Sequence, residues 1–322
     1  MPIHEHLRDF HELPVFEFPD LLHEPDGAGE LPAPETVAWR VRIDTDDEEQ
    51  PWADAFARFL DTVDTTAVRA LVVGAWNEVY DTSAKDVIDA LVAARDRLPA
   101  LRALFLGDIV GEEAEISWIV QGAVAPLLEA FPELAEFAVR GAQELSFGPL
   151  RHERLRRLTI ESGGLPAEVV RQVAASELPA LTHLDLWLGT PEYGGDAGVT
   201  DLAPILAGAR LPSLQHLGLR NSQIQDEVCA ALASAPVVAR LAALDVSMGV
   251  LTDEGAAALL AGQPLTHLDA LDMRHHYLSD GMCARLREAL EPAGVRLDLD
   301  RGRADSHHEP DGSVWRWVAV GE

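Results

Sequence analysis

Lysine and cysteine are scarce in this sequence. Its 322 residues include one lysine, Lys85, and two cysteines, Cys229 and Cys283. So few cysteines argue against a fold held together by disulfides and indicate a reducing compartment. No apolar run approaches the roughly 20 residues that a membrane-spanning helix needs, and residues 1–20 lack the apolar stretch of a secretory signal. We therefore expect a cytoplasmic protein with no membrane partner.

Positive charge is also in short supply. The chain has 54 Asp and Glu against 25 Lys and Arg, which gives a net charge of −29. Such a surface repels phosphate backbones and anionic lipids, so we expect neither nucleic acid nor a membrane as a partner. Acidity of this kind mainly keeps a protein soluble. The preference for arginine over lysine indicates a GC-rich bacterial genome.

Motifs that carry chemistry are missing. The sequence has no G-x-S-x-G, no phosphate-binding Walker loop, no H-E-x-x-H and no cysteine pair at metal-ligand spacing. We therefore predict no catalytic residues, no metal ligands and no cofactor, and expect that the protein is not an enzyme. The two cysteines are expected to be buried free thiols, because they lie two repeats apart, beyond disulfide reach.

What the sequence does contain is an internal repeat of the form L-x-x-L-x-L. Clear copies are LPALRALFL at 98–106, LPALTHLDL at 178–186 and LPSLQHLGL at 211–219. The first apolar position falls at Leu101, Leu134, Leu155, Leu181, Leu214, Leu241 and Leu268. The steps between them are 33, 21, 26, 33, 27 and 27 residues, which is typical of stacked supersecondary units. Weaker copies at 41–43, 68–73 and 297–299 bring the expected number of strands to about ten.

Helix signals lie between these strands. Thr252 is a good N-cap for the segment that follows it, and Ser279-Asp280 precedes Met282, Leu286 and Leu290, whose spacing of four marks one helix face. Similar segments occur at 83–98, 166–176 and 225–234. Each unit is therefore a strand, a turn and a helix, and neighbouring units must stack to bury their apolar faces.

At these residues the chain resembles the leucine-rich-repeat family, in particular its ribonuclease-inhibitor-like branch. The best match is LGLRNSQIQDEV at 217–228, LDVSMGVLTDEG at 244–255 and LDMRHHYLSDGM at 271–282. The resemblance covers about residues 35–300 and extends to uncharacterised actinobacterial repeat proteins. It implies an α/β fold, a right-handed solenoid or horseshoe with a parallel sheet on the concave side and helices on the convex side.

The two ends lack the repeat and are expected to cap it. We predict an N-terminal cap or arm at 1–34, the solenoid at 35–300 and a C-terminal capping strand at 301–322. The tail alternates like a strand from Gly312 to Val320, and we expect it to pair antiparallel with residues 295–300.

Side chains that alternate with the strand leucines should form rows on the concave face. The middle row is apolar at its N-terminal end, with Val72 and Phe105. We favour an arm at Leu13–Phe18 that covers them, and the alternative is an exposed apolar patch. The C-terminal end of the same row carries Asp245, Asp272 and Asp298 on adjacent strands.

These residues lead to two hypotheses of function. The first is a monomeric, non-enzymatic scaffold that binds a protein partner of unknown identity on the concave face, because Trp and Arg are the usual anchors of protein interfaces. The predicted partner-binding residues are Trp187, Arg220, Asn221, Asp245, Asp272, Arg274 and His275. The second is an accessory or catalytic protein that uses the aspartate row with a divalent cation. A solvated face whose charges serve only solubility remains an alternative to both.

Overall fold

The computed structural model describes residues 3–22, 29–45, 50–311 and 313–321. The chain forms two compact units. The first consists mainly of Met1–Gly148 and His152–Leu158, and the second of Pro149–Arg151 and Thr159–Gly321. The cap, solenoid and tail boundaries that the sequence indicates remain predictions, and residues 1–2 and 23–28 of the expected cap lie outside the described residues.

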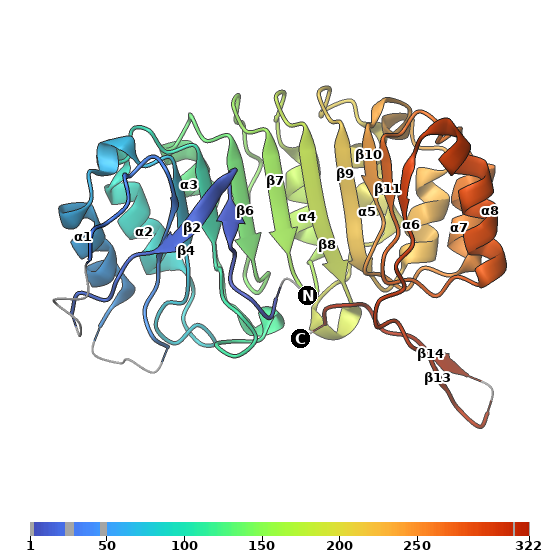
Figure 1. Ribbon diagram of the computed structural model, residues 1–322, viewed down its shortest axis with the longest axis horizontal. Coiled ribbons are helices and arrows are strands. Elements are labelled where there is room, and N and C mark those ends of the chain that lie inside the picture. Colours follow the sequence, from blue (N-terminus) through green and yellow to red (C-terminus); the bar gives the residue numbers. More distant parts are fainter. Residues whose placement is uncertain (1–2, 23–28, 46–49, 312, 322) are drawn as a thin grey trace. The chain divides into compact units, whose positions relative to one another are not determined.

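The strands form a long, mostly parallel sheet whose neighbours follow the order of the chain (Figure 1). Strands β1 and β2 form an antiparallel hairpin, whereas β2 to β6 and β8 to β12 pair in parallel. Among the described residues this sheet consists of β1 (Asp9–Phe10), β2 (Leu13–Glu17), β3 (Ala38–Val41), β4 (Ala70–Val73), β5 (Ala103–Leu106), β6 (Glu136–Arg140), β7 (Arg157–Glu161), β8 (His183–Gly189), β9 (His216–Ser222), β10 (Ala243–Asp245), β11 (Ala270–Asp272) and β12 (Arg296–Asp298). A separate antiparallel pair consists of β13 (His307–His308) and β14 (Val314–Trp315).

Helices alternate with most of these strands and lie behind the sheet in Figure 1. They are α1 (Trp52–Thr62), α2 (Lys85–Ala93), α3 (Ala125–Ala130), α4 (Ala167–Ala175), α5 (Val199–Ala207), α6 (Gln225–Leu232), α7 (Asp253–Ala261) and α8 (Asp280–Leu290). The predicted cap at Thr252 is confirmed, because its side chain accepts from the backbone N–H of Glu254. Ser279 caps α8 in the same way, through the N–H of Met282. None of the helices in the described part of the chain has the length and apolarity needed to cross a bilayer.

The leucines of the repeat motif form the core between the sheet and the helices. In the second unit Leu184, Leu217, Leu244 and Leu271 are buried and lie opposite one another on β8 to β11. Fully burying a leucine side chain contributes about 1.5–3 kcal/mol, so this row is a main source of stability. The fold is therefore the α/β repeat of leucine-rich type that the sequence predicted. Cys229 and Cys283 are buried free thiols, also as predicted.

The register confirms the predicted rows on the face opposite the helices, which we call the open face. In the first unit Val72 lies beside Phe105, and Phe105 beside Ala138. In the second unit Asp245 lies between Gly218 and Asp272, and Asp272 beside Asp298. The open face therefore carries an apolar row in one unit and an acidic row in the other.

Two predictions about the ends of the sheet are wrong. The first strand of the repeat is Ala38–Val41 rather than 41–43, and β2 adds a further parallel strand before it. In the described part of the tail, no residue pairs with residues 295–300. The tail's short strand β14 pairs with β13 instead, and the residues after β14 bond to His275, Met248 and Asn221.

Candidate functional site

The N-terminal arm closes the open face of the first unit. Phe10 and Phe105 pack edge to face with their ring centroids 5.8 Å apart. Val72 is completely buried and Phe105 is 3% exposed. Leu7, Leu13 and Val15 pack against the same cluster. The expectation that the arm covers Val72 and Phe105 is confirmed, although the covering residues start at Leu7 rather than at Leu13.

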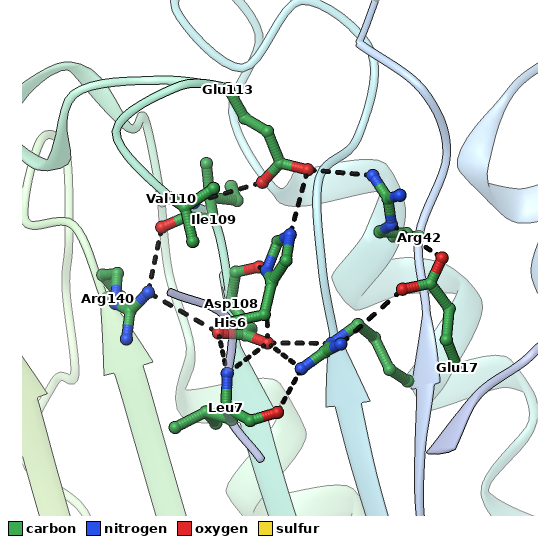
Figure 2. Close-up of polar contacts among 10 residues, drawn as sticks. His6, Leu7, Glu17, Arg42, Asp108, Ile109, Val110, Glu113 and Arg140 are labelled. Carbon is green, nitrogen blue, oxygen red and sulfur yellow. Dashed lines mark hydrogen bonds and ion pairs between the residues drawn. The ribbon is translucent and has the colours of Figure 1, made fainter. Parts of the chain in front are cut away.

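A buried carboxylate fixes this arm in place, as Figure 2 shows. Asp108 lies just after β5 and is completely buried. It accepts hydrogen bonds of 2.8 Å from Nε of Arg40 and of 3.2 Å from the backbone N–H of Leu7. Arg140, also completely buried, lies 3.5 Å away. The Asp108 carboxylate thus joins two strands of the sheet to the arm.

A second set of charges continues this network towards the solvent. Glu113 lies 3.5 Å from Nε2 of His6 and accepts a hydrogen bond of 2.9 Å from Arg42 (Figure 2). Arg42 also donates to Glu17 on β2, at 3.0 Å. The arm is therefore held at several charged points, and His6 lies between two acids.

The pKa values of these groups follow from their contacts. Hydrogen bonds with Asp108 and Glu113 raise the pKa of His6 to about 9. Burial alone would raise the pKa of Asp108, but its hydrogen bond with His6 and the charges of Arg40 and Arg140 hold it below its ordinary value. At neutral pH the network therefore contains a charged imidazolium and ionised carboxylates.

Replacing His6 with glutamine is expected to change the pH dependence of stability. The folded-state pKa of His6 lies above its unfolded value of 6.5, so its contribution is fully present below pH 6.5 and is lost as the pH rises through about 9. The free energy of unfolding of the wild type should exceed that of His6→Gln most at pH 6. The difference between the two should shrink steadily towards pH 9. Urea unfolding of both proteins across this range measures it. A difference independent of pH would contradict the assignment.

In the second unit the open face carries a row of aspartates bridged by arginines. Arg220 lies at its centre, 2.9 Å from Asp185 and 3.2 Å from Asp245. Its Nε also donates to Oγ of Ser247, at 3.1 Å. Burial alone would lower the pKa of Arg220, but Asp185 and Asp245 raise it above its ordinary value. Arg220 is therefore a permanent charge that offsets two of the acids.

Gly218 lets this bridge form across β9. A Cβ atom at this glycine would lie 2.7 Å from Oδ1 of Asp185, which is closer than real Cβ contacts. Because position 218 has no side chain, the carboxylate of Asp185 can lie over β9 and reach Arg220. A glycine in the middle row of a strand is otherwise unfavourable, and this contact explains why it stands here.

Asp245 is the aspartate with the most perturbed pKa in this row. Burial raises the pKa of Asp245 to about 6, Arg220 opposes the change, and Asp272 and Asp185 add to it. Its carboxylate also accepts a hydrogen bond of 2.9 Å from the backbone N–H of Ser247. The Asp245 carboxylate is thus held in place by Ser247 and Arg220, and the residue is only 7% exposed.

The end of the row near β12 remains open to solvent. Arg274 contacts Asp272 at 2.6 Å and Asp298 at 3.5 Å. The side chains of Arg274 and Asp298 are about half exposed, at 48% and 52%.

Trp187 lies beside Arg220 on the neighbouring strand, as predicted, but it is not exposed. It is 2% exposed, and the guanidinium of Arg220 lies over its ring at 5.4 Å from the centroid. Its indole N–H is buried without a hydrogen-bond partner among the described residues. The expectation of an aromatic anchor on the surface is therefore wrong, because neighbouring parts of the second unit enclose the ring.

Asn221 and His275 are occupied by the C-terminal tail. The side chain of Asn221 donates to the carbonyl of Val320 at 2.6 Å and accepts from its N–H at 3.0 Å. Nε2 of His275 lies 3.0 Å from the carbonyl of Trp317. Of the seven predicted residues, Asp272 and Arg274 are thus the most accessible, while the others make buried or tail contacts.

A pair of histidines that lie opposite each other on β8 and β9 is a further candidate that sequence reasoning left out of the site. His183 and His216 stack with their ring centroids 5.3 Å apart, on neighbouring strands. Both are partly exposed. The signal in the sequence was that both histidines occupy the same position of the repeat, so they had to lie side by side. In the part of the chain that the structure describes, no group of three or more His, Cys, Asp or Glu is arranged to hold a metal ion.

Comparisons with known proteins support the fold. No family model and no curated protein matches the sequence. A crystal structure of a Bacteroides fragilis protein from the Northeast Structural Genomics Consortium is similar, with 29% identity and a TM-score of 0.79 over 89% of this chain and 78% of that chain. An internalin from Listeria monocytogenes has 16% identity and a TM-score of 0.39 over 72% of this chain and 54% of that chain, a likeness too weak to bear on function.

Proposed function

We propose that this protein is a non-enzymatic interaction scaffold whose protein partner binds the open face of the second unit. The observation that carries this proposal is the aspartate row, in which Asp272, Arg274 and Asp298 are reachable from solvent. The open face of the first unit is closed by its own arm. Within the proposal the scaffold is a cytoplasmic, bacterial monomer that binds neither nucleic acid nor membranes.

The charges of the row indicate the chemistry of the partner. Four aspartates, at 185, 245, 272 and 298, face two arginines, at 220 and 274. The row therefore has an excess of negative charge, in a chain whose net charge is −29. A partner with basic side chains would offset this excess and would be attracted over a Debye length of about 10 Å at moderate salt. Asp272, Arg274 and Asp298 would make the direct contacts.

Fewer residues contact the partner directly in this proposal than the sequence predicted. Asp245 would be a buried member of the row, Arg220 and Trp187 would support it, and Asn221 and His275 hold the tail. The second hypothesis, a divalent cation on the aspartate row, has no observation in its favour, since the aspartates each contact an arginine. The assignments to the ribonuclease-inhibitor-like branch and to an actinobacterial source stay predictions.

Neutralising the accessible aspartates is expected to weaken capture of the partner. The tagged double variant Asp272→Asn with Asp298→Asn should retain the partner at least about tenfold less than the wild type, because it removes the excess charge of the row. Quantitative affinity capture from native cells measures this, and raising the salt should weaken wild-type capture in the same way.

The matched control carries the same change of charge elsewhere in the second unit. Glu227 on α6 and Glu288 on α8 lie on helices rather than on the open face, and Glu227→Gln with Glu288→Gln should leave capture unchanged. If the two double variants capture the partner equally well, the partner does not use the aspartate row.

A further inference from the structure

The C-terminal tail crosses the second unit at the carboxyl ends of its strands (Figure 1). Residues 317–320 contact in turn the segment after β11, the segment after β10 and the C-terminal end of β9. The tail thus runs across the strands and passes from later repeats to earlier ones. It lies beyond the rows that form the open face.

The bonds that hold the tail are made mainly to its backbone. The N–H of Ala319 donates to the carbonyl of Met248 at 2.8 Å. Asn221 bonds both the N–H and the carbonyl of Val320. The hydroxyl of Tyr277 donates to the carbonyl of Trp317 at 2.8 Å, beside the bond from His275. Contacts of this kind recognise an extended backbone and are tolerant of its sequence.

The side chains of the tail divide into two sets. Val318 and Val320 are buried, at 8% and 1% exposed. Trp315 and Trp317 are more than half exposed, at 56% and 54%. Two small aliphatic groups therefore anchor the segment, while its largest apolar groups contribute little to holding it.

The residues that receive the tail share an unusual backbone. Asn221, Met248 and His275 have positive φ angles of 54°, 69° and 54°. They follow one another at 27 residues, since 248 − 221 and 275 − 248 are both 27. A non-glycine residue with positive φ is uncommon and costs about 1 kcal/mol or more. These three residues recur in register, and each bonds the tail. Together with Tyr277 they form what we call the tail site (Asn221, Met248, His275 and Tyr277).

In the first unit, a residue at the same repeat position contacts the N-terminal arm. Asp108 lies two residues after the last strand leucine, Leu106, just as Asn221 does after Leu219. Asp108 accepts from the backbone N–H of Leu7 in the N-terminal arm. Within each unit, then, this position binds the backbone of a segment that lies outside the repeats.

We propose that the tail site is a binding site for an extended peptide of a partner protein, with small aliphatic residues at alternate positions, and that the chain's own tail competes for it. The tail shows which chemistry the site accepts, because it is already seated there through its main chain and two valines. A tethered segment has an effective concentration of order mM, so a partner peptide must displace it. This proposal concerns a different surface from the aspartate row and does not depend on it.

The test uses the full chain with its tail weakened. Ala319→Pro removes the N–H that donates to Met248, and Val320→Asp places a charge where a buried valine lies. The probe is a labelled synthetic peptide with the sequence of residues 314–321. Fluorescence anisotropy should show that it binds the Ala319→Pro, Val320→Asp protein at least about tenfold more tightly than the wild type. Adding Asn221→Ala should remove this gain.

Trp317→Ala changes an exposed side chain and should bind the peptide as weakly as the wild type does. Equal binding by all variants would overturn the proposal, as would a released tail, seen by its loss of protease protection, without peptide binding. Dimers formed by exchange of the tail would also overturn it, because the occupant would then be a second copy.

The wild type gives a second readout that does not depend on any variant. Saturating peptide should speed hydrogen exchange at the amides of Ala319 and Val320, since displacement removes their acceptors at Met248 and Asn221. Unchanged exchange with bound peptide would place the peptide elsewhere and would overturn the proposal. Binding lost with Asp272→Asn but retained with Asn221→Ala would instead point to the aspartate row.

Discussion

Asp108→Ala is expected to lower the free energy of unfolding by about 3–5 kcal/mol. The carboxylate is completely buried between Arg40 and Arg140, and its removal leaves two buried guanidinium groups without their shared partner. It also removes the acceptor for the backbone N–H of Leu7, so the arm should loosen and expose Phe105. Urea unfolding followed by circular dichroism measures the loss, and binding of a hydrophobic dye measures the exposed face.

A surface aspartate of the same unit is the matched control. Asp61 pairs with Arg97 at 3.1 Å, and its side chain is 75% exposed. Because exposed ion pairs contribute little, Asp61→Ala should change the unfolding free energy by no more than about 0.5 kcal/mol. Equal effects of the two substitutions would mean that Asp108 does not hold the arm.

Trp187→Ala is expected to destabilise the second unit by about 3–5 kcal/mol, as removal of a buried tryptophan usually does. The ring is 2% exposed and lies beneath Arg220, so its loss leaves a cavity and also removes support from the aspartate row. Thermal and urea unfolding test this. Partner capture by this variant would fall because the unit unfolds, which distinguishes it from Asp272→Asn with Asp298→Asn.

Trp315 provides the comparison for this substitution. It is 56% exposed in the same unit, and Trp315→Ala should shift stability by no more than about 0.5 kcal/mol. A Trp187→Ala protein as stable as Trp315→Ala would show that the indole is not a core residue.

The strand positions were predictable because their signal is periodic and local. A leucine that recurs every 27 residues or so must face the core, and its neighbours must then face the other way. This reasoning placed Asp245 beside Asp272 and Val72 beside Phe105, and the register confirms both pairs. Helix caps such as Thr252 are equally local and were found for the same reason.

The environment of the site residues was not predictable, since it depends on segments far away in the sequence. Asn221 bonds Val320, 99 residues later, and His275 bonds Trp317, 42 residues later. Nothing in the repeat indicates that the tail would cross these positions instead of pairing with β12. Asp108 follows an apolar strand, but nothing in the sequence links it to His6 and Leu7, which it contacts in the arm.

The arm also constrains the order in which the first unit can fold. His6 contacts Asp108, 102 residues later, and His11 contacts Glu136, 125 residues later. A chain made from its N-terminus therefore releases the arm first, yet the arm has nowhere to dock until β5 and β6 have emerged. In the interval Val72 and Phe105 have no cover, and at a synthesis rate of about 5–20 residues per second this lasts for several seconds. The nascent first unit thus passes through a stage in which its apolar face is open to chaperones.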